Sequence, residues 1–151
     1  MGMLITKKSQ YALRAVLEIA KKSGSDVLTI EEIAEAQHIP RRFLGGILTQ
    51  LAQGGVLMSR RGKTGGYALG RPAQYISVGD VVKIIEGPLD QVCCQNEEER
   101  RDCIAAGGCA FIPMWKEAFD ALNKVFEKTM LSDLVERDRN LAAAHNHNYT
   151  I

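Results

Sequence analysis

The chain has 151 residues, of which 46% are hydrophobic and 25% charged, proportions that favour a small globular domain with at most one appended element. No apolar run approaches the ~20 residues that cross a bilayer and no secretory signal opens the chain, so we expect a cytoplasmic protein without a membrane partner. Residues 1–72 carry 11 Lys and Arg against five Asp and Glu, whereas residues 73–151 carry eight against 13. A basic first half suits a module that binds a polyanion such as nucleic acid.

The first half of the chain predicts three helices. Apolar residues at helical spacing indicate the first over residues 7–22, and Thr29 with Glu32 forms a capping box that starts the second. The third runs from Pro40, a residue favoured at the first helical position, to about Gln53. Its inward face comprises Leu44, Ile47, Leu48 and Leu51.

A β-hairpin is expected after these helices. Residues 56–61 and 67–69 read as two short strands, and the glycine-rich residues 62–66 join them. Three helices followed by a hairpin is the order of a winged helix-turn-helix. We therefore expect a mainly α fold with a small β-hairpin wing, extended by a long dimerisation helix.

The second half supplies that long helix. Ser77 and Asp80 resemble a cap pair for a helix over residues 77–86, residues 89–112 read as a loop with all four cysteines, and Pro113 opens the long helix. Apolar residues spaced four, three and four apart are typical of a seam between two helices, although a surface helix packed on its own domain is the alternative. These seam residues are Trp115, Phe119, Leu122 and Phe126.

Three regions and a last helix follow from this pattern. Residues 1–88 form the DNA-binding domain, residues 89–112 the cysteine-bearing loop, and residues 113–151 the dimerisation helix and the C-terminal part. Within the third region, residues 131–144 are expected to form the last helix.

The third helix and the wing carry the residues expected to bind DNA. A recognition helix reads base edges in the major groove, and Arg is the best reader of guanine, which favours Arg41 and Arg42. Gly45 and Gly46 lie on the outward face, where they either allow close approach to DNA or are a tolerated weakness of the helix. The remaining candidates are Thr49 and Gln50 on the helix and Arg60, Arg61, Lys63 and Thr64 on the wing.

The cysteines point to metal or redox chemistry, because disulfides are disfavoured in the cytoplasm. Zinc prefers closer Cys pairs than those found here. Cys94, Cys103 and Cys109, with eight and five residues between them, suit an iron–sulfur cluster, which thiolates also bind. Cys93 is an alternative to Cys94, because adjacent cysteines rarely both bind one metal.

Several stretches resemble the IscR/NsrR-type family of winged-helix regulators over nearly the whole chain. They are residues 5–7 with 11–14, 33–34 with 39–40, 61–69, 76–81, the cysteine spacing and 131–135. The resemblance implies a homodimer that binds a pseudo-palindromic operator in double-stranded DNA. It also implies that Cys94, Cys103 and Cys109 bind a 2Fe–2S or 4Fe–4S cluster whose state controls DNA binding in response to redox, nitric oxide or iron–sulfur status.

Two positions depart from that family pattern. Ile112 stands where IscR-like members have a histidine ligand, and Gln10 stands where NsrR-like members have an acidic ligand from the partner. The fourth ligand is therefore open among Gln10, Cys93, a loop carboxylate such as Glu97, and an exogenous thiol. Gly45 replaces an acidic residue that IscR-like members use to discriminate operators, so their operator sequence does not transfer.

Two other functions are compatible with the residues. One is a cluster-free repressor of the same family whose thiols respond to oxidants or sulfur compounds. The other is an iron–sulfur electron-transfer protein or a metal-dependent enzyme, but the chain lacks a Ser/His/Asp set, a paired-carboxylate motif and a Walker phosphate loop. We therefore expect a regulator and not an enzyme.

Overall fold

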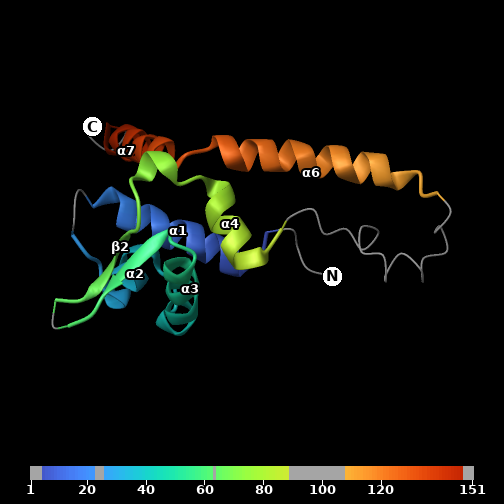
Figure 1. The fold of residues 1–151 in the computed structure, drawn as a ribbon. Coiled ribbons are helices and arrows are strands. Elements are labelled where there is room, and N and C mark those ends of the chain that lie inside the picture. The colour runs from blue at the N-terminus through green and yellow to red at the C-terminus, as the bar shows by residue number, and fades with distance from the viewer. Residues whose placement is uncertain (1–4, 23–25, 63, 89–107, 148–151) are drawn as a thin grey trace.

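The computed structural model describes residues 5–22, 26–62, 64–88 and 108–147. Helices and one hairpin follow each other in the predicted order (Figure 1). The elements are α1 (Lys7–Lys21), α2 (Ile30–Gln37), α3 (Arg41–Gln53), β1 (Leu57–Arg60), β2 (Gly66–Leu69), the 3₁₀ turn η1 (Ala73–Tyr75), α4 (Val78–Glu86), α6 (Phe111–Lys128) and α7 (Leu131–His147). The mainly α winged-helix prediction is confirmed.

One apolar core joins α1, α2, α3, the hairpin and α4, which together we call the head. The predicted inward face of α3 is confirmed, since Leu44, Ile47, Leu48 and Leu51 are all buried. These positions repeat at helical spacing, so one side of the helix is buried away from water. The opposite side of α3 is therefore free to face a partner.

Local capping sets where the head helices begin. Thr6 caps α1 by accepting a hydrogen bond from the Ser9 backbone N–H. The predicted capping box of α2 is present, with the Thr29 side chain bonded to the Glu32 N–H and the Glu32 carboxylate bonded to the Thr29 N–H. Each such cap satisfies amide groups that have no acceptor inside the helix.

The turn between α2 and α3 places the recognition helix. His38 ends α2 in the left-handed conformation, with φ 49°, and Ile39 is buried. Pro40 is the N-cap of α3 and not its first helical residue, because its ψ of 124° is extended. The fixed φ of proline fits both the N-cap and the first helical position, so the sequence alone does not decide between these two positions.

The wing is an antiparallel pair in which Leu57 faces Leu69 and Arg60 faces Gly66. β1 is shorter than predicted, spanning residues 57–60 and not 56–61. Leu28 adds an isolated bridge: its N–H donates to Tyr67 O at 2.9 Å, and the Tyr67 N–H donates to Leu28 O at 2.8 Å. The segment before α2 thus anchors the base of the wing to the head.

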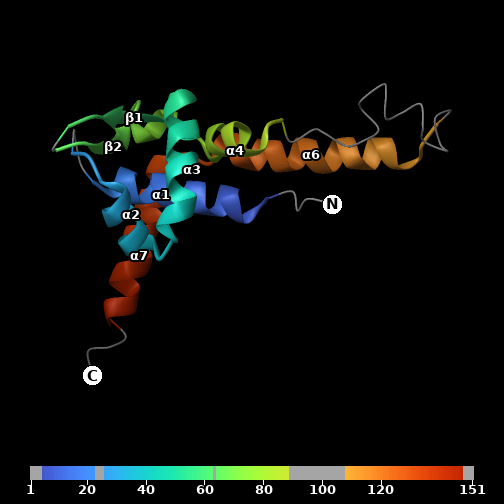
Figure 2. The same cartoon turned by 90° about the horizontal axis from the view of Figure 1, so that it is seen from below.

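Of the last two helices, α6 begins away from the head and runs toward it, and α7 then packs on the head (Figure 1). α6 begins at Phe111, two residues before the predicted Pro113. Proline is tolerated there because the first four N–H groups of a helix have no intrahelical acceptor. The first half of α6 extends beyond the head (Figures 1 and 2), whereas α7 packs on α1 with Leu131 and Val135 buried.

Candidate nucleic-acid interface

The outward side of α3 carries the two predicted base-reading arginines. Arg41 and Arg42 are both exposed. The Arg41 guanidinium pairs with the Glu31 carboxylate on α2, and the Arg42 guanidinium carbon lies 4.8 Å from the centroid of the Phe43 ring. α3 and the two strands of the hairpin lie on the same side of the head, away from α6 and α7 (Figure 1). The geometry brings helix and wing together on one face.

The glycine pair opens the centre of this face. A Cβ atom added to Gly45 or Gly46 would meet nothing within 4 Å, so packing inside the protein does not require either glycine. Each costs about 1 kcal/mol of helix stability relative to alanine. Thr49, one turn later, is exposed, and its hydroxyl donates to Gly45 O at 2.8 Å. The structure therefore gives no internal reason for the glycines.

The wing loop presents further positive charge. Arg60, Arg61 and Thr64 are exposed, and Lys63 lies outside the described residues. Gly65 is needed for the turn, because a Cβ there would lie 2.5 Å from Arg60 O. The tight turn holds the two arginines at the base of the loop, where they can grip a phosphate backbone.

Lys7 and Lys8 are cations of this region that the sequence analysis did not assign to the interface. Both are exposed at the start of α1, and they line a groove shared with Arg42 and Gly46 of α3. Two adjacent lysines after a helix cap were a visible signal. Their proximity to α3, however, depends on the tertiary packing of α1 against that helix.

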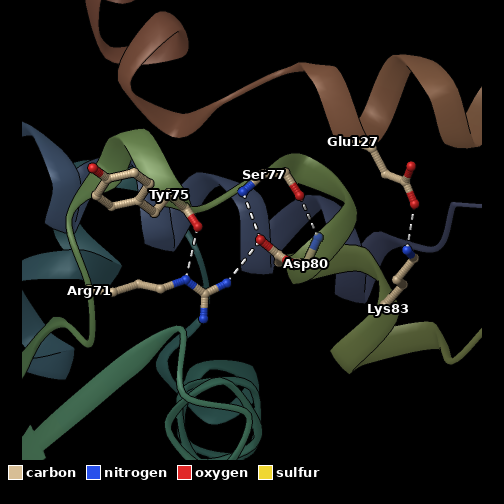
Figure 3. A network of polar contacts seen from close by, with 6 residues as sticks. All are labelled: Arg71, Tyr75, Ser77, Asp80, Lys83 and Glu127. Atoms are coloured by element: carbon tan, nitrogen blue, oxygen red, sulfur yellow. Dashed lines mark hydrogen bonds and ion pairs between the residues drawn. The ribbon is translucent and has the colours of Figure 1, made fainter.

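A polar network joins the base of the wing to α4 (Figure 3). Arg71 donates to Tyr75 O and to Asp80 Oδ2, both at 2.9 Å, and the same oxygen accepts from the Ser77 N–H at 2.9 Å. Partial burial raises the pKa of Asp80, but hydrogen bonds from Ser77 and Arg71 outweigh it and hold the pKa below its usual value. The predicted cap pair of Ser77 and Asp80 is confirmed as a capping box.

A second ion pair continues from α4 to α6. Lys83 Nζ lies 2.8 Å from Glu127 Oε1, and Figure 3 shows the two side chains pointing toward each other from the two helices. Gly79 also lies against Glu127, since a Cβ atom added to Gly79 would be 3.4 Å from Glu127 Cγ. α4 thus lies between the wing and the long helix.

Cys109 is the predicted cluster ligand that the structure describes. It is half-buried, is not in a disulfide, and lies two residues before α6, where its carbonyl oxygen accepts from the Ile112 N–H at 3.2 Å. Cys93, Cys94 and Cys103 lie outside the described residues. Within the described ranges, no three His, Cys, Asp or Glu side chains gather in a way that could hold a metal ion.

In the part of the chain that the structure describes, no element covers the seam of α6 along much of its length. None of the described residues of α6 is buried. Trp115 is 42% exposed and its ring centroid lies 6.4 Å from that of Phe119, while Leu122 and Phe126 are half-buried. Phe111, Met114 and Val125 of the same helix are exposed as well, and contiguous exposed apolar surface is typical of a surface that binds another protein. No helix in the described part of the chain is long and apolar enough to cross a membrane.

Comparison with known proteins places this architecture among regulators. The family model named Rrf2, described as an iron-dependent transcriptional regulator, matches residues 5–137. An rrf2-like HTH-type regulator of Rhodobacter capsulatus is 34% identical, over 87% of this chain and 92% of that protein. The HTH-type regulator IscR of Yersinia pseudotuberculosis is 29% identical, over 97% of this chain and 87% of that protein. The structure of CymR, the global cysteine regulator of Bacillus subtilis, matches with a TM-score of 0.71 at 29% identity, over 91% of this chain and 98% of that one.

Proposed function

This chain belongs to the Rrf2 family of iron-dependent transcriptional regulators, and from that premise we propose how it binds DNA and what controls the binding. The predicted resemblance to IscR-type winged-helix regulators is confirmed, and the chain is a DNA-binding transcription regulator. It would act in the cytoplasm, where bacterial DNA lies. The observation that carries the proposal is the shared face of α3 and the wing, with its exposed arginines.

On this face, α3 enters the major groove and the wing grips the flanking backbone. Arg41 and Arg42 read bases, and Thr49 contacts the DNA further along the helix. Because Gly45 and Gly46 have no side chain, the backbone of α3 can approach the DNA closely between them. Arg60, Arg61, Lys63 and Thr64 hold phosphates or the minor groove. To contact a base, Arg41 would have to break its ion pair with Glu31. This costs little, because an ion pair at the surface contributes little to stability.

Fluorescence anisotropy with a duplex selected from a random library tests this interface. Arg42→Ala is expected to weaken binding to the selected duplex by about 5- to 150-fold, the ~1–3 kcal/mol of one bidentate base contact. Arg139→Ala is the matched control, because Arg139 is an exposed arginine of α7, on the opposite side of the head (Figure 1). Equal loss in both variants would contradict the assignment of the face.

A homodimer would present two such faces to a pseudo-palindromic operator. The seam residues Trp115, Phe119, Leu122 and Phe126 would pack against those of a second copy. Phe119→Glu should convert the dimer to a monomer in sedimentation velocity, because a charge in an apolar seam is costly. Glu117→Gln on the exposed part of the same helix should leave the dimer intact. A dimer that persists in Phe119→Glu would place the interface elsewhere.

An iron–sulfur cluster is the control element we propose, with Cys94, Cys103 and Cys109 as thiolate ligands. Cys109 fits the role, since it is half-buried and not in a disulfide. When bound, the cluster would supply a centre that redox change, nitric oxide or iron–sulfur supply can alter. Ile112 lies within α6 and Gln10 is exposed on α1, so the fourth ligand stays open among Gln10, Cys93, Glu97 and an exogenous thiol.

Anaerobic purification with iron and sulfide analysis, visible absorption and Mössbauer spectroscopy tests the cluster and its type. Replacing any one of the three cysteines by serine should abolish the absorption, whereas Cys93→Ser should retain it if Cys93 is not a ligand. A colourless, iron-free protein with unchanged operator binding would overturn cluster control.

Thiol sensing without a cluster is the second candidate, favoured by the similarity to the global cysteine regulator CymR and by the presence of a fourth cysteine. Its signature differs, because a thiol pair needs two cysteines and a cluster needs three. Operator binding that responds to oxidants in iron-free protein, and that survives loss of one of the three proposed ligands, would establish it.

A further inference from the structure

A groove runs along the head between the first turns of α1 and the exposed side of α3. Its volume is about 680 Å³, within the ~300–1,000 Å³ typical of small-molecule pockets. Tyr11, Phe43 and Ile47 form apolar walls, and the rings of Tyr11 and Phe43 lie 6.1 Å apart. Phe43 is 45% exposed. An aromatic side chain left open beside a groove offers a stacking surface to a flat ligand.

Positive charge surrounds this apolar floor. Lys7, Lys8 and Arg42 are the charged residues of the groove, and among the described residues that line it there is no Asp or Glu. The lysines come from α1 and the arginine from α3, so the charge flanks the groove from two elements. Such an arrangement favours an anionic group on the ligand.

Gln50 adds an unsatisfied acceptor beside the groove. Its Oε1 is buried and has no hydrogen-bond partner, the single such side-chain oxygen or nitrogen in the described part of the chain. A buried polar atom without a partner costs about 1–3 kcal/mol, and most such atoms are satisfied. The terminal torsion of glutamine is soft, so a small rotation turns this oxygen toward a donor in the groove.

We propose that the groove binds a small organic anion with a flat apolar body, a carboxylate and one N–H or O–H donor. The body stacks on Phe43 and Tyr11, the carboxylate meets Lys7, Lys8 or Arg42, and the donor satisfies Gln50. Because Arg42 and Gly46 also belong to the proposed DNA-binding face, the ligand competes with DNA. This last step rests on the proposed function, whereas ligand binding itself does not.

Three compounds test the chemistry on the full chain without DNA, by isothermal titration and saturation-transfer NMR. Indole-3-acetate has all three features, 1-naphthaleneacetate lacks the N–H donor, and 3-methylindole lacks the carboxylate. We expect saturable binding of indole-3-acetate, about fivefold weaker binding of 1-naphthaleneacetate through loss of one hydrogen bond, and weaker binding still of 3-methylindole. Gln50→Met should abolish the preference for the indole acid over the naphthyl acid.

A pair of glycine variants locates the site. Gly46 lines the groove and Gly45 does not, yet an added Cβ at either meets nothing within 4 Å. Leucine at either position also improves helix propensity, so we expect both variants to fold, and circular dichroism checks this. Gly46→Leu should fill the groove and abolish indole-3-acetate binding, whereas Gly45→Leu should retain it.

The outcomes separate this inference from the DNA-binding function. Failure of all three compounds to bind the wild-type chain at millimolar concentration, or equal binding to the two leucine variants, overturns the ligand site. If DNA binding persists in that case, the proposed function stands. Ligand binding in a chain that binds no DNA would instead keep the site and refute the proposed interface.

Discussion

Glu86 ties the end of α4 to the start of α1, and its replacement should destabilise the head. One carboxylate oxygen, Oε1, accepts from Ser9 Oγ at 2.5 Å, from Thr6 Oγ1 at 2.5 Å and from the Thr6 N–H at 3.2 Å. Ser9 is fully buried, so removal of the Glu86 carboxylate leaves the Ser9 hydroxyl without this hydrogen-bond acceptor. The chain continues from Glu86 into the segment that carries the cysteines.

The cost of Glu86→Ala follows from these contacts. A hydrogen bond to a charged group contributes about 1.5–3 kcal/mol, and three that share one oxygen do not add fully. We expect a loss of about 2–3 kcal/mol, which for a chain of this size lowers Tm by about 5–10 °C. Glu136→Gln, at an exposed carboxylate of α7, should leave Tm unchanged.

The pH dependence gives the sharper test. Partial burial raises the pKa of Glu86, but the hydrogen bonds from Ser9 and Thr6 outweigh it and lower the pKa below its usual 4.5. Because the folded-state pKa is depressed, the stabilisation is fully present above the ordinary pKa and is lost as pH falls through the folded value. Urea denaturation of wild type and Glu86→Gln should therefore differ at pH 7 and converge in acid. A difference that does not change with pH would refute the carboxylate's role.

Three further outcomes are expected. Thr29→Ala should lower the free energy of unfolding by about 1 kcal/mol in urea denaturation, because it removes the capping box of α2; no change would show that water replaces the cap. Asp80→Asn should weaken both stability and DNA affinity at pH 7, since the carboxylate holds Arg71 at the base of the wing; unfolding and anisotropy measurements that disagree would separate the two effects. Arg61→Ala should reduce the slope of log affinity against log salt by about one, and an unchanged slope would remove this arginine from the phosphate contacts.

Features set by neighbours three or four residues apart were predictable from the sequence. Thr29 with Glu32 and Ser77 with Asp80 are capping boxes because the cap and its partner lie within one turn. The buried side of α3 was equally clear, since helical spacing alone determines which residues share a face. The exposed position of Arg42 follows from the same spacing. These features carry most of the candidate interface.

Contacts between distant segments were not predictable. Glu86 meets Thr6 across 80 positions, and Leu28 bridges to Tyr67, yet neither pair has a local pattern. The start of α6 at Phe111 was missed because proline is equally acceptable at the first and third helical positions. The groove between α1 and α3 was not predictable either, because it joins distant segments. Lys7 and Gln50 approach each other only when the two helices pack.

α4 is bonded both to the residue that follows the wing and to α6, the helix that we propose forms the dimer. On one side, Asp80 accepts from Arg71, which follows the wing directly in sequence. On the other, Lys83 pairs with Glu127 of α6, and the two contacts lie one turn apart on α4. α4 has only nine residues, so if it moved as a rigid body, a shift of α6 in a dimer would displace the wing as well. The two half-sites of a palindromic operator have a fixed spacing along the duplex, so in the proposed dimer a small displacement through α4 would change operator affinity.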